Sequence, residues 1–228
     1  MEPDKHIVIS LGGSLIVLDE IDTEFIKNFV DTIKIYIEKG FKFVLITGGG
    51  HTARTYIKAS KEITTPSNTD LDWIGIASTR LNAELLRVAF GDIAHNSIIM
   101  SPDQIPDTQK SVLIGGGWKP GNSSDLAAVH SAQSVGAKKV INLSNIDYAY
   151  NKDPKKFPDA FKIEQSSWSD FRAILPKEWD PGLNSPFDPV AAKKAEELGL
   201  EVVIMNGKNI ENLKKYLNGE EFVGSVIH

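Results

Sequence analysis

Residues 41–54 have the sequence FKFVLITGGGHTAR. The first seven residues are mostly apolar, as expected of a strand buried on both faces of a sheet, and three glycines follow it directly. A segment with helical spacing begins after the glycines, over residues 51–63. A strand, a glycine turn and a helix in this order predict one repeat of a parallel α/β sheet.

The same alternation continues along the chain. Further Val- and Ile-rich runs predict core strands: HIVISL (6–11), VLIGGG (112–117), KKVINLS (138–144) and LEVVIMN (200–206). Helical spacing predicts helices over residues 25–37, with Gly40 as the stop, and over 70–90, 122–135, 167–175, 189–199 and 209–218. We therefore expect an α/β fold with a mostly parallel sheet and helices on both faces, formed by residues 1–228 as a single domain.

Composition excludes several classes of protein. The 228 residues carry 25 Lys and Arg against 30 Asp and Glu, a formal charge of −5, which argues against binding to nucleic acid or to an anionic membrane. The absence of Cys excludes disulfides and thiolate metal sites and fits the cytoplasm. No apolar run approaches the roughly 20 residues that span a bilayer, and the amino terminus lacks the pattern of a signal peptide.

Three predicted strands run into glycine turns: LGGS (11–14), TGGGHTAR (47–54) and GGGWKPGNSSD (115–125). Glycines before a helix expose backbone N–H groups beside the positive end of the helix dipole, a combination that binds phosphate. One such turn is more often a steric feature than a phosphate site, but three on parallel strands meet at one edge of the sheet. The chain lacks the GxxxxGK[ST], GxGxxG, GxSxG and HExxH motifs, which argues against Walker ATPases, Rossmann dehydrogenases and zinc hydrolases.

Two charged residues follow the second turn. Arg54 is expected in the first turn of the helix over 51–63, where its guanidinium can reach back to an anion at the glycines. Asp72 lies at the start of the helix over 70–90. Taken alone, it is interpreted as a negative charge that complements the helix dipole. Residues 64–69, 101–110 and 151–160 are predicted loops, and the last is expected directly after a buried strand, at the edge where α/β sheets bind ligands.

In order, VISLGGSL, VLITGGGHTARTYIKA, DLDWIGIASTRLNA, GGGWKPGNSSDLAA, NLSNIDYAYNKDP and FDPVAAKKA resemble the amino acid kinase superfamily, and within it the archaeal-type uridylate kinases. The resemblance covers nearly the whole chain. It implies a three-layer αβα sandwich that transfers the γ-phosphoryl group of ATP to UMP with Mg²⁺, in a homohexamer. It also implies an acceptor-side half over about 1–135 and an ATP-side half over about 136–228.

The resemblance assigns roles to individual positions. It implies that Gly49, Gly50 and Arg54 hold the acceptor phosphate, that Asp72 binds the ribose hydroxyls, and that Gly117 and Ser124 line the uracil pocket. Gly12, Gly13 and Ser14 match the turn that faces the transferring phosphoryl group, and Asn145, Tyr150 and Asp153 match the ATP-binding segment. Asp188 and Lys193 match the DPxAAK motif, in which the Asp organises the site and the Lys neutralises phosphate charge. No metal ligands are assigned.

The chain departs from the family pattern at four positions. Ser10 stands where many members have a Lys on the first strand, Tyr148 replaces the glycine of NVDG, and Trp118 and Lys119 lie in the uracil-side loop. Two alternatives stay open. One is a kinase of the same superfamily for a carboxylate, carbamate or isopentenyl phosphate, since His51 adjoins the second turn. The other is a non-catalytic nucleotide-binding or storage protein.

Overall fold

A seven-stranded sheet forms the centre of the protein. The structure, a computed structural model, describes residues 6–176 and 185–228. The strands run in the order β3-β2-β1-β4-β8-β9-β7. Their bounds are β1 His6–Leu11, β2 Lys42–Thr47, β3 Val112–Gly115, β4 Lys139–Ser144, β7 Gln165–Ser166, β8 Glu201–Asn206 and β9 Ser225–Ile227. A second sheet pairs β5 (Ala149–Tyr150) with β6 (Lys162–Ile163).

All five strands predicted from the sequence are present and run parallel to one another. β9 is antiparallel to β8 and carries β7 at the edge of the sheet. The prediction of a mostly parallel α/β sheet is thus confirmed. The sequence pattern missed β5, β6, β7 and β9, because strands of two or three residues are too short to show a period.

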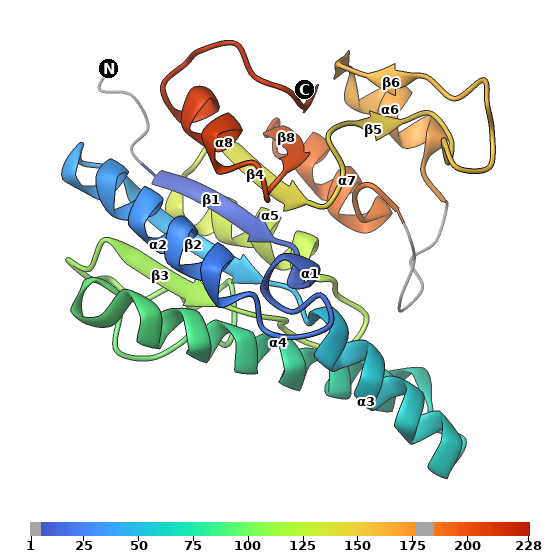
Figure 1. Cartoon of the computed structure of the whole chain (residues 1–228), viewed down its shortest axis with the longest axis horizontal. Helices are drawn as coiled ribbons and strands as arrows, with labels where there is room; N and C mark the ends of the chain where they lie inside the picture. The colour runs from blue at the N-terminus through green and yellow to red at the C-terminus, as the bar shows by residue number, and fades with distance from the viewer. Residues whose placement is uncertain (1–5, 177–184) are drawn as a thin grey trace.

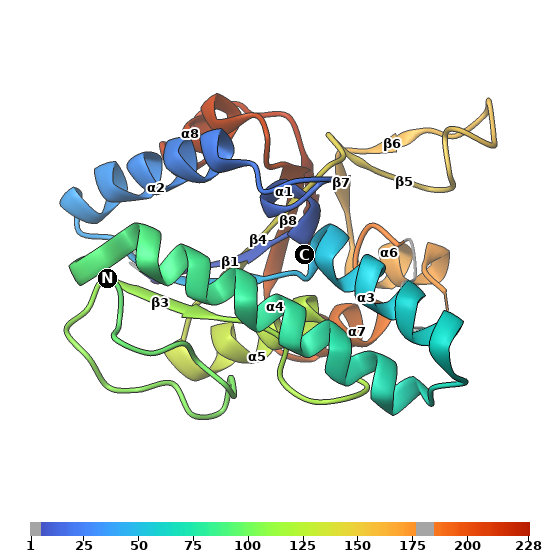
Figure 2. The same ribbon diagram turned by 60° about the horizontal axis from the view of Figure 1, so that its bottom comes forward.

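Helices cover both faces of the sheet, as predicted, so the fold is a three-layer sandwich. Their bounds are α1 Gly13–Ile16, α2 Thr23–Glu38, α3 Gly50–Ile63, α4 Asn68–Phe90, α5 Ser124–Val135, α6 Trp168–Ile174, α7 Pro189–Glu197 and α8 Ile210–Leu217, with a 3₁₀ turn at Gly91–Ile93. Figure 2 shows α2 and α8 on one side of the sheet and α5 and α7 on the other. Among the helices in the described ranges, none has both the length and the apolar character needed to cross a bilayer.

Side chains of one strand alternate between two cores. On β1, Val8 packs with the core on the α5 and α7 side, whereas Ile9 and Leu11 pack with the core on the α2 side. Because side chains alternate with a period of two, Ser10 shares the face of Val8 and is directed toward α5. This alternation brings a hydroxyl of the first strand to the helix that follows the third glycine turn.

Local sequence explains where the longest helices begin. The Asp22 carboxylate caps α2 by accepting from the Phe25 N–H at 2.9 Å. Ser67 and Asp70 form a capping box at the start of α4. Figure 1 shows α3 projecting from the body of the molecule beside the first half of α4, and no residue of α3 is buried.

One loop prediction is corrected in part. Residues 151–160 do form an irregular connection, but they do not follow a strand of the central sheet directly. They join β5 to β6 in the separate antiparallel hairpin. The chain first leaves β4 at Ser144, and residues 145–148 therefore occupy the edge that the loop was expected to occupy.

Candidate active site

The first two glycine turns lie against each other. A Cβ atom added to Gly13 would lie 2.1 Å from the Gly50 nitrogen and 2.6 Å from the Gly48 carbonyl carbon, so only glycine fits. The Gly48 N–H also donates to the Leu11 carbonyl at 2.8 Å. Steric necessity therefore accounts for part of the glycine pattern, and the same contact brings the turns after β1 and β2 together.

The second turn has the backbone geometry of an anion-binding nest. Gly49 is in the right-handed helical region, with φ −82° and ψ −23°, and Gly50 follows with φ +62°. Successive right- and left-handed residues point their N–H groups into one concavity, here at the start of the 14-residue helix α3. In the described part of the chain, the Gly49 and Gly50 amides donate no backbone hydrogen bond. The turn therefore presents two amides and a helix dipole to an anion.

Arg54 connects these two turns. It lies in the second turn of α3, not the first as predicted, because α3 begins at Gly50. Its guanidinium donates to Ser14 Oγ at 3.3 Å and to the Leu18 carbonyl at 3.4 Å, and the residue is exposed. A cation thus lies between the helix of the first turn and that of the second.

The third turn is held by α4, through residues that the sequence analysis did not identify. Thr79 Oγ1 accepts from the Gly117 N–H at 2.6 Å, and the Thr79 carbonyl accepts from Thr47 Oγ1 at 2.7 Å. Arg80 donates to the carbonyls of Gly117 and Trp118 at 3.3 and 3.0 Å. Because the Gly117 amide is already bonded, this turn is fixed by the protein itself.

Asp72 also contacts the loop after the third turn. Its Oδ2 accepts from the Gly121 N–H at 2.7 Å, across 49 residues of sequence. Since Ser67 and Asp70 cap α4, Asp72 is not needed as its terminal charge. The carboxylate instead joins α4 to the segment that precedes α5.

Trp118 and Lys119, the two departures in this loop, stack on the α5 side. The Trp118 ring meets His130 of α5 edge to face at 5.3 Å, and Lys119 Nζ lies 4.0 Å from the Trp118 ring centre. Burial lowers the pKa of His130, although the nearby Asp103 opposes this effect. Trp118 therefore packs against the core beneath the sheet.

Asp125 is the central residue that the sequence analysis missed. Its Oδ1 accepts from Ser10 Oγ at 2.8 Å and from Asn142 Nδ2 at 2.9 Å, and its Oδ2 accepts from the Asp188 N–H at 3.3 Å. One carboxyl group thus joins β1, β4, α5 and the start of α7. Burial raises the pKa of Asp125 to about 6, despite the hydrogen bond from Ser10. The signal was present in the sequence, because Asp125 follows the third glycine turn directly.

The two residues of the DPxAAK motif have different environments. Asp188 is 6 % exposed and caps α7, since its Oδ1 accepts from the Ala191 N–H at 2.6 Å and Pro189 occupies the first helical position. Burial also raises the pKa of Asp188. Lys193 lies on the same helix and is exposed. The structure thus places a cation on the helix whose N-cap residue, Asp188, contacts Asp125.

The segment from Asn145 to Asp153 crosses the same edge of the sheet. Asn145 is exposed directly after β4, and Tyr150 is the last residue of β5. Asp153 lies farther out, where its carboxylate accepts from the Lys155 N–H at 2.9 Å and lies 3.8 Å from Lys156 Nζ. The tertiary structure therefore brings together the three glycine turns, Arg54 and Asp188, while Asp153 belongs to the hairpin.

The described residues contain no group of three or more His, Asp or Glu side chains placed to hold a metal ion. Asp125 and Asp188 are neighbouring carboxyl groups, and each already accepts hydrogen bonds from the protein. Mg²⁺ is commonly held by one or two carboxylates together with substrate phosphates. The donor set fits a cation that arrives with a nucleotide rather than one held by the protein alone.

Fold and sequence together define the class of protein. Residues 5–206 match the model of the Amino acid kinase family, and the chain belongs to that family. The chain is 34% identical to a uridylate kinase of Methanobrevibacter smithii, over 97% of this chain and 98% of the relative. It is also 34% identical to a uridylate kinase of Methanospirillum hungatei, over 97% of this chain and 94% of the relative.

A solved structure supports the same grouping. The uridylate kinase from Archaeoglobus fulgidus superposes with a TM-score of 0.83 and 33% identity, covering 97% of this chain and 99% of that one. A UMP kinase from Bacillus anthracis shares the fold, with a TM-score of 0.74, at 18% identity. The expectation of an amino acid kinase fold is confirmed, and the similarity is to archaeal uridylate kinases over nearly their full length.

Proposed function

We propose that this chain is an ATP-dependent kinase that converts UMP to UDP. The observation that carries the proposal is the contact between the first two glycine turns, with a nest at Gly49 and Gly50 and the Arg54 guanidinium beside it. Two anionic nucleotides can meet there only if amides and cations offset their repulsion. The full-length relatives named uridylate kinase support UMP as the acceptor.

The acceptor half of the proposal uses the second and third turns. Gly49, Gly50 and Arg54 would hold the phosphate of UMP, Asp72 its ribose hydroxyls, and Gly117 and Ser124 the uracil. Asp72 accepts a hydrogen bond from the Gly121 N–H, and an ionised carboxylate has acceptor capacity to spare. Ribose binding therefore does not require that the loop after the third turn be released.

The donor half uses the first turn and the segment after β4. Gly12, Gly13 and Ser14 would face the transferring phosphoryl group, and Asn145, Tyr150 and Asp153 would hold the rest of ATP. We divide the domain into an acceptor side over about 1–135 and an ATP side over about 136–228. The first turn belongs to the amino-terminal half by sequence, and its contact with the second turn, Gly13 against Gly50, brings the two phosphate positions together.

Such a site needs no general base. The transition state of phosphoryl transfer is loose and its charge is spread over equatorial oxygens, so alignment and electrostatic stabilisation dominate catalysis. Amides of the glycine turns align the two phosphates, and Lys193 offsets the developing charge. Asp188 fixes the start of the helix that carries Lys193. Mg²⁺ brought by ATP would add charge neutralisation.

The proposal includes self-association, with a homohexamer as the assembly that the resemblance implies, and residence in the cytoplasm. Trp73, Leu81 and Val88 lie eight and seven residues apart on α4 and are 49, 62 and 66 % exposed, so they share one helix face. Tyr56 and Ile63 of α3 are also exposed, at 64 and 83 %. A surface of this kind is expected to be covered by another protein surface, here a second copy of the chain.

The test is ADP release with ATP, Mg²⁺ and one acceptor at a time. The proposal requires UMP to be phosphorylated with a kcat/KM well above that of CMP, AMP, GMP, a carboxylate, carbamate or isopentenyl phosphate. A higher kcat/KM for the carboxylate, the carbamate or isopentenyl phosphate would show that the chain is a different kinase of the family. Nucleotide binding without any ADP release would show that it is a non-catalytic nucleotide-binding protein.

A further inference from the structure

Tyr148 is the departure from the family pattern that lies on the donor side. It stands between β4 and β5, four residues after Ser144, and its side chain is partly exposed. Lys162 Nζ of β6 lies 4.7 Å from the centre of its ring, and the same ammonium pairs with Glu164 at 2.6 Å. The ring is therefore held in place by its neighbours and is not simply a solvated side chain.

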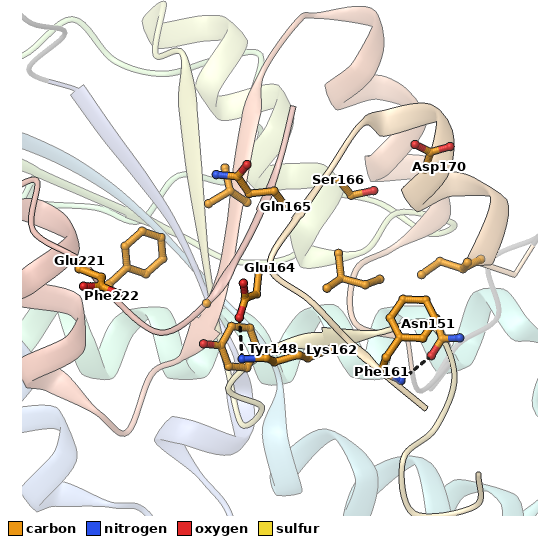
Figure 3. Close-up of a pocket in the computed structure, with 14 residues that line it drawn as sticks. Tyr148, Asn151, Phe161, Lys162, Glu164, Gln165, Ser166, Asp170, Glu221 and Phe222 are labelled. Carbon is orange, nitrogen blue, oxygen red and sulfur yellow. Dashed lines mark hydrogen bonds and ion pairs between the residues drawn. The ribbon is translucent and has the colours of Figure 1, made fainter. Parts of the chain in front are cut away.

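Tyr148 lines a cavity of about 800 Å³ between the β5–β6 hairpin, α6, the edge strand β7 and its neighbour β9. Figure 3 shows Tyr148 with Lys162 and Glu164 on one side of this cavity and Phe161 with Asn151 on the other. Phe161 is 62 % exposed. Aromatic faces together with amide, ammonium and carboxylate groups suit a flat ligand that also forms hydrogen bonds.

The cavity lies on the ligand-binding edge of the sheet. Ser225 fastens the hairpin above β9, because its Oγ accepts from the Ala149 N–H at 2.9 Å and donates to the Ile163 carbonyl. Ser225 pairs with Ile204 near the end of β8. β9 is the third strand from β1 in the order β1-β4-β8-β9, so the two strands are about 14 Å apart across the sheet.

That separation matches the length of an extended nucleoside triphosphate. Between the two ends lie Asn145 and the pair formed by Asn206 and Asp147, whose side chains are joined at 2.9 Å. A triphosphate at Gly12 and Gly13 would thus reach the cavity with its base.

We propose that the Tyr148 ring is the platform on which the base of the nucleoside triphosphate donor stacks, so that Tyr148 determines donor affinity. This inference rests on the proposed function, because it takes the first glycine turn as the site of the transferring phosphoryl group. Tyr148 takes no part in the chemistry itself. Its contribution is to binding of the donor and not of the acceptor.

The experiment measures the affinity of the full-length protein for AMP-PNP and for inorganic tripolyphosphate, and the steady-state constants with ATP and UMP. Tyr148→Ala should weaken AMP-PNP binding and raise the KM for ATP by about tenfold or more, the usual effect of removing one base-stacking ring. Tripolyphosphate affinity, the KM for UMP and kcat should be unchanged. Tyr148→Phe should behave like the wild type, because the ring is retained.

Phe157→Ala is the matched control. Phe157 lies in the same hairpin, is exposed and has Lys152 Nζ 5.4 Å from its ring, but it lies outside the cavity. Tyr148→Leu keeps the apolar bulk and replaces the Ala variant if that variant does not fold. Unchanged AMP-PNP affinity in the folded variant, or an equal loss in Phe157→Ala, overturns the inference. A wild type that binds AMP-PNP but leaves UMP unphosphorylated overturns the proposed function, while the binding measurement still decides the role of Tyr148.

Discussion

Ser10 Oγ donates a hydrogen bond to Asp125 Oδ1 at 2.8 Å, although 115 residues separate the two in sequence. Ser10 is 3 % exposed and stands where many family members carry a Lys. Asp125 therefore has a neutral donor where a cation would otherwise offset its charge. Burial raises the pKa of Asp125 to about 6 and the nearby Asp188 adds to the rise, whereas the hydrogen bond from Ser10 opposes it.

This raised pKa predicts a pH dependence of stability. Between about pH 4 and pH 6 the folded protein retains a proton on Asp125 that the unfolded chain has released, so the free energy of unfolding falls as pH rises. A pKa of about 6 in place of 3.8 corresponds to about 3 kcal/mol across this interval. Urea unfolding from pH 4 to 8 should show a smaller decrease in Asp125→Asn than in the wild type. Identical pH profiles would contradict the prediction.

Ser10→Ala should destabilise the protein by about 1 to 2 kcal/mol, because Asp125 Oδ1 then keeps only the Asn142 donor. Ser131 offers a matched control: it is fully buried on α5, and its hydroxyl is the one buried side-chain polar atom without a partner in the described residues. Ser131→Ala should be neutral or stabilising. Equal losses in both variants would mean that the Ser10 hydrogen bond contributes nothing specific.

Arg54→Ala should raise the KM for UMP about ten- to a hundredfold, since it removes a charge-assisted hydrogen bond of about 1.5 to 3 kcal/mol to the acceptor phosphate. The fold should be unaffected, because Arg54 is exposed and its two bonds to the protein are long. Lys58→Ala, on the same helix and paired with Glu62, is the control. If the KM for UMP of Arg54→Ala equals that of Lys58→Ala, Arg54 does not bind the acceptor phosphate.

Asp72→Asn separates the two roles of that carboxyl group. An Asn oxygen can still accept from the Gly121 N–H, so the loop and the melting temperature should be retained. The affinity for UMP should fall by about tenfold, and 2′-deoxy-UMP should be affected less, because a charge-assisted bond to ribose is lost. Asp70→Ala, which removes one partner of the capping box on the same helix, should reduce stability without changing UMP affinity. If Asp72→Asn has the same KM for UMP as the wild type, Asp72 does not bind the ribose, and its role is limited to the contact with Gly121.

Lys193→Ala should lower kcat about a hundred- to a thousandfold with a smaller change in the KM for UMP, because it removes a stabiliser of charge that develops in the transition state. Lys194→Ala changes the neighbouring lysine on α7 and should retain most activity. Ser10→Lys should preserve or raise activity if the position faces the phosphates, since it restores the Lys that many family members carry on the first strand. If Lys193→Ala keeps the kcat of the wild type, phosphoryl transfer does not take place beside α7.

The hydrophobic pattern by itself determined the five parallel strands and the helices between them, because buried strands and amphipathic helices have distinct periods. It also indicated the three glycine turns, and β3, β2 and β1 place them side by side as expected. The resemblance supplied residue roles that composition and spacing do not contain. The short strands β5, β6, β7 and β9 could not be predicted, since two or three residues carry no period.

Only the tertiary structure decided what the polar residues contact. Asp125 looks like one more acid at a helix start in the sequence, yet it receives donors from β1, β4 and α7 because three separate segments converge on it. Asp72 likewise acquires its partner from a loop 49 residues away. Local periodicity reports which face of an element is buried, whereas a buried carboxyl group takes its pKa and its partners from segments that sequence distance does not reveal.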